Sequence, residues 1–354
     1  MNKEREKDAI ALFNDYEDFC RGCIEELWMK DRLIDSLSMQ ECFDARKIIL
    51  SGNGLGHAAA VSAFPVFQAN CDIFFGTEIM DQAEFNYFNN VEAMGIGEPR
   101  TPLVLLASES EDDKDCEETL KIVNKVGANS LLICAGKSSK QEAIANNVLY
   151  LGLDKEDRLY MAKAFLGMVI ALCALAYRIG RVRGTVSELD VRAVKEGMLS
   201  YIASIRDHIS EYAEAAEDFA AMCGDNSCFD YIADAEAKGT AEACGVIGAR
   251  KQGYRFTVND SEEWCHVNYW MEDRFNLCTI MLGFKDQPSF SRIIETMGCV
   301  HKLERPYLFV TDAEPEEFLE GTRCLRIPEP PKGKRWFSTF ASFIPAVLAV
   351  DKRS

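Results

Sequence analysis

The sequence has few basic residues for its size and no basic stripe. Its 354 residues include 57 acidic and 39 basic ones, which gives a formal net charge of −18. A surface this negative repels phosphate backbones, and no lysine- or arginine-rich run with interleaved aromatics offsets the repulsion. We therefore expect no nucleic acid among the partners of this protein.

A signal peptide and a long apolar run are also missing. The first 15 residues are charged and helical in pattern, with no apolar core bounded by a cleavage site. The most apolar run, Met161–Ala176, is roughly 16 residues long and contains Lys163, so it is too short and too interrupted to cross a bilayer. We expect a buried helix there and no membrane partner.

The paired ligands of a zinc site are absent, although the chain has 14 cysteines. Cys20 and Cys23 form a C-x-x-C spacing in an amphipathic helical stretch, but no second pair and no His-x-His completes a tetrahedral set. We interpret them as cysteines on a helix face and expect no metal and no other cofactor. Scattered cysteines without a signal or a membrane span indicate reduced thiols and a cytoplasmic protein.

What the sequence does contain is an alternation of short apolar runs and helical stretches. Up to about residue 35 the apolar positions recur every three or four residues, as in a helix. After that, near-continuous apolar runs alternate with helical patterns, which indicates parallel strands covered on both faces. The strands expected in the first half are Lys47–Ser51, Cys71–Phe75, Leu103–Ala107, Ser130–Cys134 and Val148–Leu151, followed by a long helix, Tyr160–Ile179.

The second half of the chain repeats this order. Corresponding strands are expected to begin 175 to 183 residues apart, a regularity that indicates an internal duplication. We expect an N-terminal helical segment over residues 1–35, a first domain over residues 36–184 and a second domain over residues 185–354 with a leading helix. The second set of strands is Phe229–Ala233, Tyr254–Val258, Cys278–Leu282, Pro306–Val310 and Cys324–Ile327, followed by a helix, Ser338–Val350.

Each half is predicted to be a doubly wound α/β unit, a five-stranded parallel sheet between helices. In such folds ligands bind at the carboxyl ends of the strands. The loops that follow the strands are therefore the places to search for function.

The loop after the first strand, Gly52–His57, is rich in glycine and leads into an alanine-rich helix. Glycines here either let a ligand approach the backbone N–H groups or only form a tight turn, and the spacing leaves both interpretations open. The G-x-G-x-x-G spacing of dinucleotide-binding folds fails, because alanine stands at its third glycine. This failure argues against a nucleotide-dependent enzyme.

The loop after the third strand, Ser108–Asp113, combines hydroxyls with four carboxylates. Hydroxyls at alternate positions before a helix suit an oxyanion ligand, whereas the carboxylates would oppose a dianionic phosphate. The same acids would suit a helix N-terminus without any ligand, because they complement the helix dipole. Both interpretations stay open at this point.

Two glutamates stand beside a histidine after the second strand of the second half, in a chain with only four histidines. Glu263 and His266 are three residues apart on a helical turn, so they lie on one side of it and can share a ligand. Both types of side chain can move protons near neutral pH when they are partly buried. Further metal ligands are not apparent, so we favour acid–base chemistry over a metal site.

On these residues the chain resembles the sugar isomerase (SIS) family, over about residues 44–350. The glycine-rich loop resembles the family's G-C-G-x-S, and Ser108–Asp113 resembles its phosphate loop, S-x-S-G-x-T. Residues 161–165 are similar to its S-T-K-A-F segment, and residues 263–266 to its E-x-x-H-G segment. The resemblance is to double-SIS proteins such as the isomerase domain of glucosamine-6-phosphate synthase and the fructosamine-phosphate deglycases. It implies two tandem SIS domains of three-layer αβα architecture and a homodimer or higher homo-oligomer with a site shared between subunits.

The sequence also departs from the family pattern. In the phosphate loop Glu111 stands in place of glycine and Asp113 in place of threonine, and Gly56 stands where the family has serine. The family's isomerase base is a glutamate sixteen residues before the histidine, where this chain has Arg250, which stays protonated and cannot act as a base. Lys352 is the nearby candidate for the lysine of the synthase tail. Met161 and Ala162 replace the Ser-Thr pair.

The resemblance implies a carbohydrate-derivative binding protein that acts as a sugar or amino-sugar (phosphate) isomerase or as a deglycase in carbohydrate metabolism. Such an enzyme opens the sugar ring and moves a proton beside the carbonyl or imine. His266 would assist ring opening, and Glu263 or Glu262 would be the base. The alternative is a non-catalytic sugar-binding or regulatory SIS protein with a degenerate active site, which Arg250 and the acidic loop favour. The expected substrate-binding residues are Gly52, Asn53, Gly54, His57, Ser108, Ser110 and Asp113.

Overall fold

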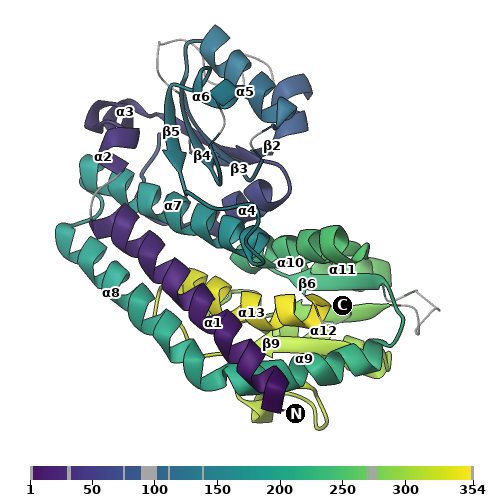
Figure 1. Cartoon of the computed structure of the whole chain (residues 1–354). Coiled ribbons are helices and arrows are strands. Elements are labelled where there is room, and N and C mark those ends of the chain that lie inside the picture. Colours follow the sequence, from purple (N-terminus) through teal and green to yellow (C-terminus); the bar gives the residue numbers. More distant parts are fainter. Residues whose placement is uncertain are drawn as a thin grey trace. The chain divides into compact units, whose positions relative to one another are not determined.

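The computed structural model describes residues 3–29, 33–74, 76–88, 102–110, 112–137, 139–268, 270 and 277–351. The chain divides into two compact units (Figure 1). One unit is Asp18–Glu196, and the other combines Met1–Glu17 with Gly197–Ser354. The dividing points fall inside two helices, α1 (Lys3–Ile24) and α8 (Glu188–Ser204). The domain boundaries expected near residues 35 and 184 stay a prediction.

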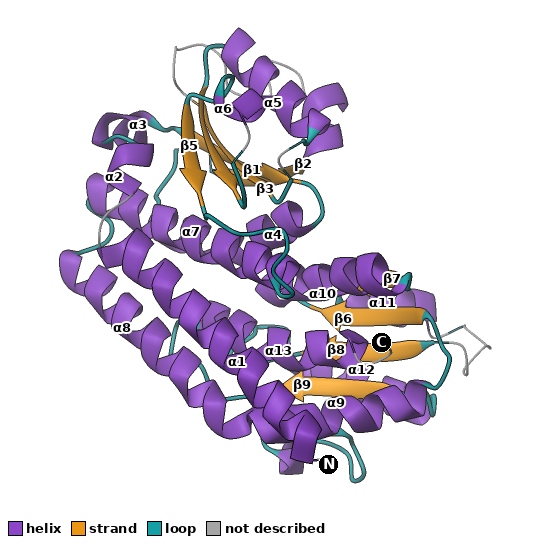
Figure 2. Cartoon of the chain, viewed as in Figure 1, coloured by secondary structure: helices purple, strands orange, loops and turns teal. Residues whose placement is uncertain are grey.

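The unit Asp18–Glu196 is a parallel five-stranded sheet with helices on both faces (Figure 2). Its strands lie in the order β2-β1-β3-β4-β5. Helices α4 (Leu55–Asn70) and α7 (Tyr160–Arg183) cover one face, and α5 (Lys114–Lys125) covers the other. The strands are β1 (Lys47–Gly52), β2 (Thr77–Asp81), β3 (Pro102–Ser108), β4 (Asn129–Cys134) and β5 (Asn147–Tyr150), and the short helices are η1 (Glu25–Met29), α2 (Leu33–Ser36), α3 (Met39–Asp44), η2 (Glu84–Phe88) and α6 (Ser139–Glu142).

The second strand of this sheet differs from the prediction. The structure places β2 at Thr77–Asp81, whereas Cys71–Phe75 was expected. Asp72 and Gly76 both have positive φ, 45° and 81°, so the backbone between α4 and β2 turns instead of extending. Phe74, which suggested a buried strand, is 77% exposed. Residues 71–74 of this apolar run therefore belong to a connection, and Phe75 lies outside the described residues.

The unit built on Gly197–Ser354 repeats the same architecture. Its parallel strands lie in the order β7-β6-β8-β9-β10, which is the order of the first sheet strand for strand. Helices α9 (Ile209–Cys223), α10 (Glu236–Gln252) and α13 (Ser338–Asp351) cover one face, and α11 (Ser261–Asn268) and α12 (Phe290–Lys302) cover the other. The strands are β6 (Cys228–Ala233), β7 (Arg255–Asn259), β8 (Cys278–Leu282), β9 (Tyr307–Thr311) and β10 (Cys324–Arg326), and the 3₁₀ turns are η3 (Ile205–His208), η4 (Pro315–Glu317) and η5 (Arg335–Phe337).

The duplication extends to individual contacts. With β2 in its observed place, corresponding strands begin 176 to 181 residues apart. Asn53 after β1 bonds to Gln82 after β2, and Asp234 after β6 bonds in the same way to Ser261 after β7. These repeats confirm the prediction of two doubly wound units, each a five-stranded parallel sheet between helices.

The N-caps of α4 and α10 have the same backbone conformation, but only the first is a glycine. Gly54 has φ 53° and ψ −119°, and Ala235 has nearly the same backbone angles, 51° and −129°. This conformation suits glycine, and a residue with a Cβ holds it under strain of about 1–3 kcal/mol. The fold of the first copy has thus been kept in the second at a position where the glycine is gone.

We expect Ala235→Gly to raise the free energy of unfolding by about 1 kcal/mol, because it relieves this strain. The methyl group of Ala235 is exposed, so its removal opens no cavity. The control is Ala237→Gly, two residues further on in the buried first turn of α10, which should lower stability by about 1 kcal/mol. Urea denaturation followed by circular dichroism measures the free energy of unfolding of both variants. If Ala235→Gly lowered it, the explanation by backbone strain would be wrong.

Within the described ranges, α7 is long and apolar enough to cross a membrane. However, 89% of its most apolar 18-residue window is buried inside the protein. It packs along α4 on one face of its sheet. We therefore interpret α7 as the buried core helix that the run Met161–Ala176 predicts.

Candidate functional site

The glycine-rich loop after β1 is shaped by close packing. A Cβ on Gly56 would lie 2.0 Å from the carbonyl oxygen of Ala107 on β3, and a Cβ on Gly52 would lie 2.7 Å from the same oxygen. Gly54 adopts the left-handed backbone that begins α4. The first turn of α4 can therefore approach β3 only because Gly52 and Gly56 lack side chains. Substrate binding by Gly52 and Gly54 stays a prediction.

Asn53 and His57 lie on either side of this turn. The Asn53 amide donates to Oε1 of Gln82 at 2.6 Å, and its oxygen accepts from the Gln82 backbone N–H at 3.4 Å. Asn53 thus ties the end of β1 to the end of β2 while its side chain stays exposed. His57 is half-buried in the first turn of α4. The two side chains border the carboxyl edge of the first sheet, as expected of a doubly wound fold.

The acidic loop after β3 is stabilised by hydrogen bonds to one of its own carboxylates, that of Asp113. Asp113 is the N-cap of α5, and its Oδ1 accepts from the Cys116 backbone N–H at 3.0 Å. The buried Ser108 hydroxyl lies 3.3 Å from Asp113 Oδ2 and 3.1 Å from the carbonyl oxygen of Ser110. The sequence left open whether this loop binds an oxyanion or complements the helix dipole, and these contacts fit the second interpretation. A carboxylate occupies the helix N-terminus where the family pattern predicts phosphate.

The rest of the loop is also bonded internally. Ser110 Oγ accepts from the Asp112 backbone N–H at 3.3 Å, and Gln141 Nε2 donates to the Ser110 carbonyl at 3.3 Å. The Tyr160 hydroxyl donates to the carbonyl of Glu109 at 2.5 Å. The hydroxyls that were expected to hold an oxyanion therefore serve the loop itself. Glu111 lies outside the described residues.

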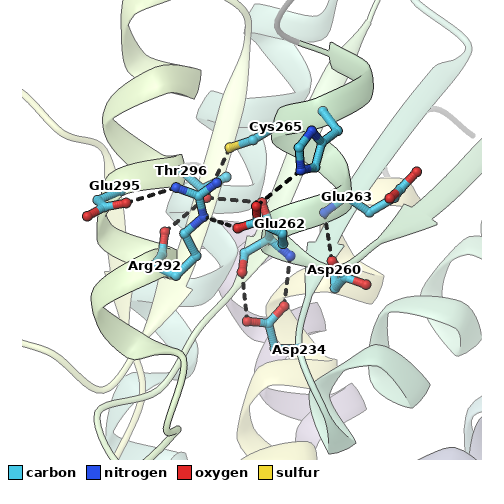
Figure 3. A network of polar contacts seen from close by, with 10 residues as sticks. Asp234, Asp260, Glu262, Glu263, Cys265, Arg292, Glu295 and Thr296 are labelled. Atoms are coloured by element: carbon cyan, nitrogen blue, oxygen red, sulfur yellow. Dashed lines mark hydrogen bonds and ion pairs between the residues drawn. The ribbon is translucent and has the colours of Figure 1, made fainter.

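Helix α11 carries the glutamates and the histidine of the second unit (Figure 3). The helix is anchored by Trp264, which is fully buried and donates to Asp230 through Nε1. Burial raises the pKa of Asp230, and the hydrogen bonds from Trp264 and Thr257 act against this increase. Asp234 accepts from both the backbone N–H and the hydroxyl of Ser261, at 2.8 and 2.9 Å, and so fixes the start of the helix.

The anchored helix presents Glu262, Glu263 and His266 to solvent. His266 Nε2 lies 3.2 Å from Glu262 Oε1, so the histidine pairs with the residue four positions earlier. In Figure 3 the side chain of Glu263 points away from Glu262, and its backbone N–H donates to Asp260. The expected Glu263–His266 pair is therefore replaced by a Glu262–His266 pair.

Glu262 also contacts a cation that the sequence did not reveal. Arg292 on α12 places Nε 2.6 Å from Glu262 Oε2 and Nη1 2.9 Å from Glu295 Oε2 (Figure 3). One carboxylate thus joins the imidazole to a guanidinium. The arrangement orients His266 through Glu262, while Arg292 shares its positive charge between Glu262 and Glu295. A histidine held by a carboxylate in this way can exchange protons with a substrate oxygen.

At the position where the family has its catalytic base, the structure has an arginine, as the sequence indicates. Arg250 lies exposed in the last turn of α10, where its charge complements the helix dipole. Lys352 lies outside the described residues. In the part of the chain that the structure describes, no three His, Cys, Asp or Glu side chains gather closely enough to hold a metal ion.

Sequence reasoning missed Asp234, Gln82 and Arg292. The first two could have been found from the duplication, because Asp234 corresponds to Asn53 and each bonds to the residue that follows the neighbouring strand. Arg292 reaches Glu262 from α12, a second helix on the same face of the sheet. No sequence motif links the two residues.

The sequence was compared with family models and with curated proteins. No family model matches the chain. Over 225 residues, 62% of this chain, the sequence is 31% identical to the isomerizing glutamine–fructose-6-phosphate aminotransferase of Neisseria meningitidis serogroup B. The aligned part is 34% of that protein, so the chain spans about a third of the length of this curated relative.

Two solved structures share the fold over nearly the whole chain. The C-terminal domain of glucosamine-fructose-6-phosphate aminotransferase from Francisella tularensis has a TM-score of 0.78 and 13% identity, covering 98% of this chain and 94% of its own. A candidate phosphosugar isomerase from Clostridium difficile 630 has a TM-score of 0.75 and 14% identity, covering 96% and 92%. The chain therefore has the tandem α/β fold of these two structures.

Proposed function

We propose that this chain, which has the tandem SIS fold, binds an unphosphorylated sugar or amino-sugar derivative and acts on it as an isomerase or deglycase. The observation that carries the proposal is the Asp113 carboxylate at the N-terminus of α5, bonded to Cys116 N–H and next to the Ser108 hydroxyl. A phosphate dianion would meet this negative charge there, whereas a protonated amine would be attracted to it. The Asp113 carboxylate oxygens, each of which accepts one hydrogen bond within the loop, can accept further ones from the hydroxyls and ammonium group of an amino sugar.

An isomerisation proceeds in two stages, ring opening and then transfer of a proton between neighbouring carbons, with no net change of oxidation state. A deglycase would in addition take up water at the resulting imine and release the amine. His266 would give a proton to the ring oxygen and take one from the anomeric hydroxyl, which opens the ring. A base would then remove the proton from the carbon beside the carbonyl or imine, and its acid form would return a proton at the neighbouring carbon. The pair of His266 and Glu262, 3.2 Å apart and adjacent to Arg292, supports the first step. Glu263, exposed on the same helix, is our candidate for the base.

His266 is 71% exposed at its side chain, so a single chain does not enclose it. We propose that α11 completes its site in a homodimer or larger homo-oligomer, as the SIS resemblance implies. Water would then be excluded from the pair when the subunits associate, which strengthens its electrostatic effect. We further propose that the protein works in the cytoplasm.

The second candidate is a sugar-binding or regulatory protein without catalysis. Arg250 favours it, because a permanently charged guanidinium stands where the family's base would be. The two candidates share a ligand class and differ in turnover, so one experiment separates them.

We expect glucosamine and fructosamine to stabilise the purified protein in thermal-shift assays and to be converted by it. His266→Ala should keep the stabilisation and lose at least about 100-fold in turnover, because acid–base catalysis supplies a factor of that size. The matched control is His208→Ala, which removes a half-buried histidine beside a glutamate, 3.7 Å from Glu211, and should change neither. Ligand binding without turnover in the natural protein would establish the non-catalytic candidate, and no response to any sugar would overturn both.

A further inference from the structure

A large cavity lies at the edge of the second sheet opposite to α11 and the carboxyl ends of the strands. Its volume is about 850 Å³. Its lining includes Tyr307, the first residue of β9, and Arg323, the residue before β10. These positions are the amino ends of the strands, where the proposed function uses no residue. A volume of this size accommodates a ligand larger than a monosaccharide.

The lining of this cavity is cationic in an otherwise acidic protein. Lys302, Arg305 and Arg323 line it together with His301, and Glu304 is the carboxylate among the lining residues. The guanidinium nitrogens of Arg305 are fully buried, so Lys302 and Arg323 are the cations that face the hollow. The chain as a whole has a formal net charge of −18, so two cations beside one carboxylate are a local reversal of sign. A concave surface lined by one sign of charge attracts ions of the other sign, and guanidinium groups match phosphate oxygens in shape.

Aromatic groups support two sides of the cavity wall. Arg305 is 3% exposed, and its guanidinium lies 5.9 Å from the ring centre of Trp264. The Tyr307 hydroxyl lies 2.9 Å from His301 Nδ1 and accepts from the Arg323 backbone N–H at 2.9 Å. One buried hydroxyl thus joins two sides of the cavity wall. The wall is therefore built from the fold and does not depend on flexible surface lysines alone.

An apolar cavity adjoins the cationic one. It has a volume of about 540 Å³ and shares Met222, Tyr307 and Arg323 with the first. Phe219 of α9 and Leu308 of β9 contribute to its lining, and Asp218 borders it. Because the two cavities share lining residues, they offer charge for an anionic group and, next to it, apolar surface for the rest of a ligand.

We infer that this double cavity is a second ligand site, which takes an organic phosphate with a flat apolar body. The phosphate would lie between Lys302 and Arg323, and the apolar body would lie against Met222. Inorganic phosphate alone would lack the apolar contacts, and an uncharged aromatic molecule would lack the ionic ones. The site shares no residue with the proposed sugar chemistry, and the two positions tested below, Lys302 and Arg323, lie apart from Trp264, the buried anchor of α11.

The test is calorimetric titration of the natural protein with 1-naphthyl phosphate, inorganic phosphate and 1-naphthol. We expect 1-naphthyl phosphate to bind with a sub-millimolar Kd, at least 10-fold tighter than either of the other two. The double variant Lys302→Gln/Arg323→Gln should weaken it at least 10-fold, and both side chains are exposed, so the fold should persist. Arg326→Gln/Lys332→Gln removes the same charge at exposed positions away from the cavity lining and is the matched control.

Two results would overturn the inference. One is the absence of naphthyl phosphate binding by the natural protein. The other is an equal loss of affinity in both double variants, since this would mean that overall charge and not the cavity attracts the ligand. Turnover of an amino sugar by His266 would be unaffected in either case, so failure here is distinguishable from failure of the proposed function.

Discussion

Asp113→Thr should give the protein measurable affinity for glucosamine 6-phosphate, at least 100-fold higher than that of the natural sequence. The change removes a carboxylate that lies against the first turn of α5 and next to the Ser108 hydroxyl. Two unit charges about 4 Å apart interact with about 4 kcal/mol at the effective dielectric of a protein surface, which exceeds the free energy of a 100-fold change. Threonine still caps the helix, so the loop keeps its support.

The matched control for this gain is Asp112→Asn. It removes the same charge one residue earlier, from a side chain that is 79% exposed and pairs with Lys140 at 3.4 Å. We expect it to change the affinity for glucosamine 6-phosphate less than 3-fold, because solvent screens this position. Isothermal titration calorimetry measures both variants. An equal gain from Asp112→Asn, or none from Asp113→Thr, would contradict the role given to Asp113.

Gly56→Ala should destabilise the protein by about 3 kcal/mol or more, which makes it the largest stability change that we predict. A Cβ at this position would lie 2.0 Å from the carbonyl oxygen of Ala107, and both atoms belong to the backbone framework, so neither can rotate away. Helix α4 would have to move off β3 and uncover buried apolar surface. The change in urea midpoint gives the measurement.

Gly22→Ala is the control for this substitution. Gly22 lies in α1, and a Cβ there would meet no atom within 4 Å. Alanine is the better helix former, so we expect a gain of about 0.5–1 kcal/mol. If Gly56→Ala were as well tolerated as Gly22→Ala, the packing explanation of the glycine-rich loop would be wrong, and a ligand-binding explanation would regain support.

The strands at the centre of both sheets could be predicted from the sequence because their surroundings are uniform. β3 and β8 are buried along their whole length, so each is a continuous apolar run with few alternatives. The edge strand β2 is mostly half-exposed, and its sequence, TEIMD, carries two acids. The more apolar residues just before it therefore gave the stronger signal, although Asp72 turns the chain there.

The candidate site could be predicted only in part. The loop positions followed from the fold, but the choice between Glu262 and Glu263 did not, since spacings of three and four residues both put a glutamate beside His266. Arg292 decides in favour of Glu262, and it does so from another helix. The acidic loop had two physical interpretations, and only the distances from Asp113 to Cys116 and Ser108 distinguish them.

The most direct test of the account is a calorimetric comparison of glucosamine and glucosamine 6-phosphate on the natural protein. The account predicts binding of glucosamine and at least 10-fold weaker binding of its phosphate ester, because Asp113 occupies the N-terminus of α5. Tighter binding of the phosphate ester by the natural protein would contradict it.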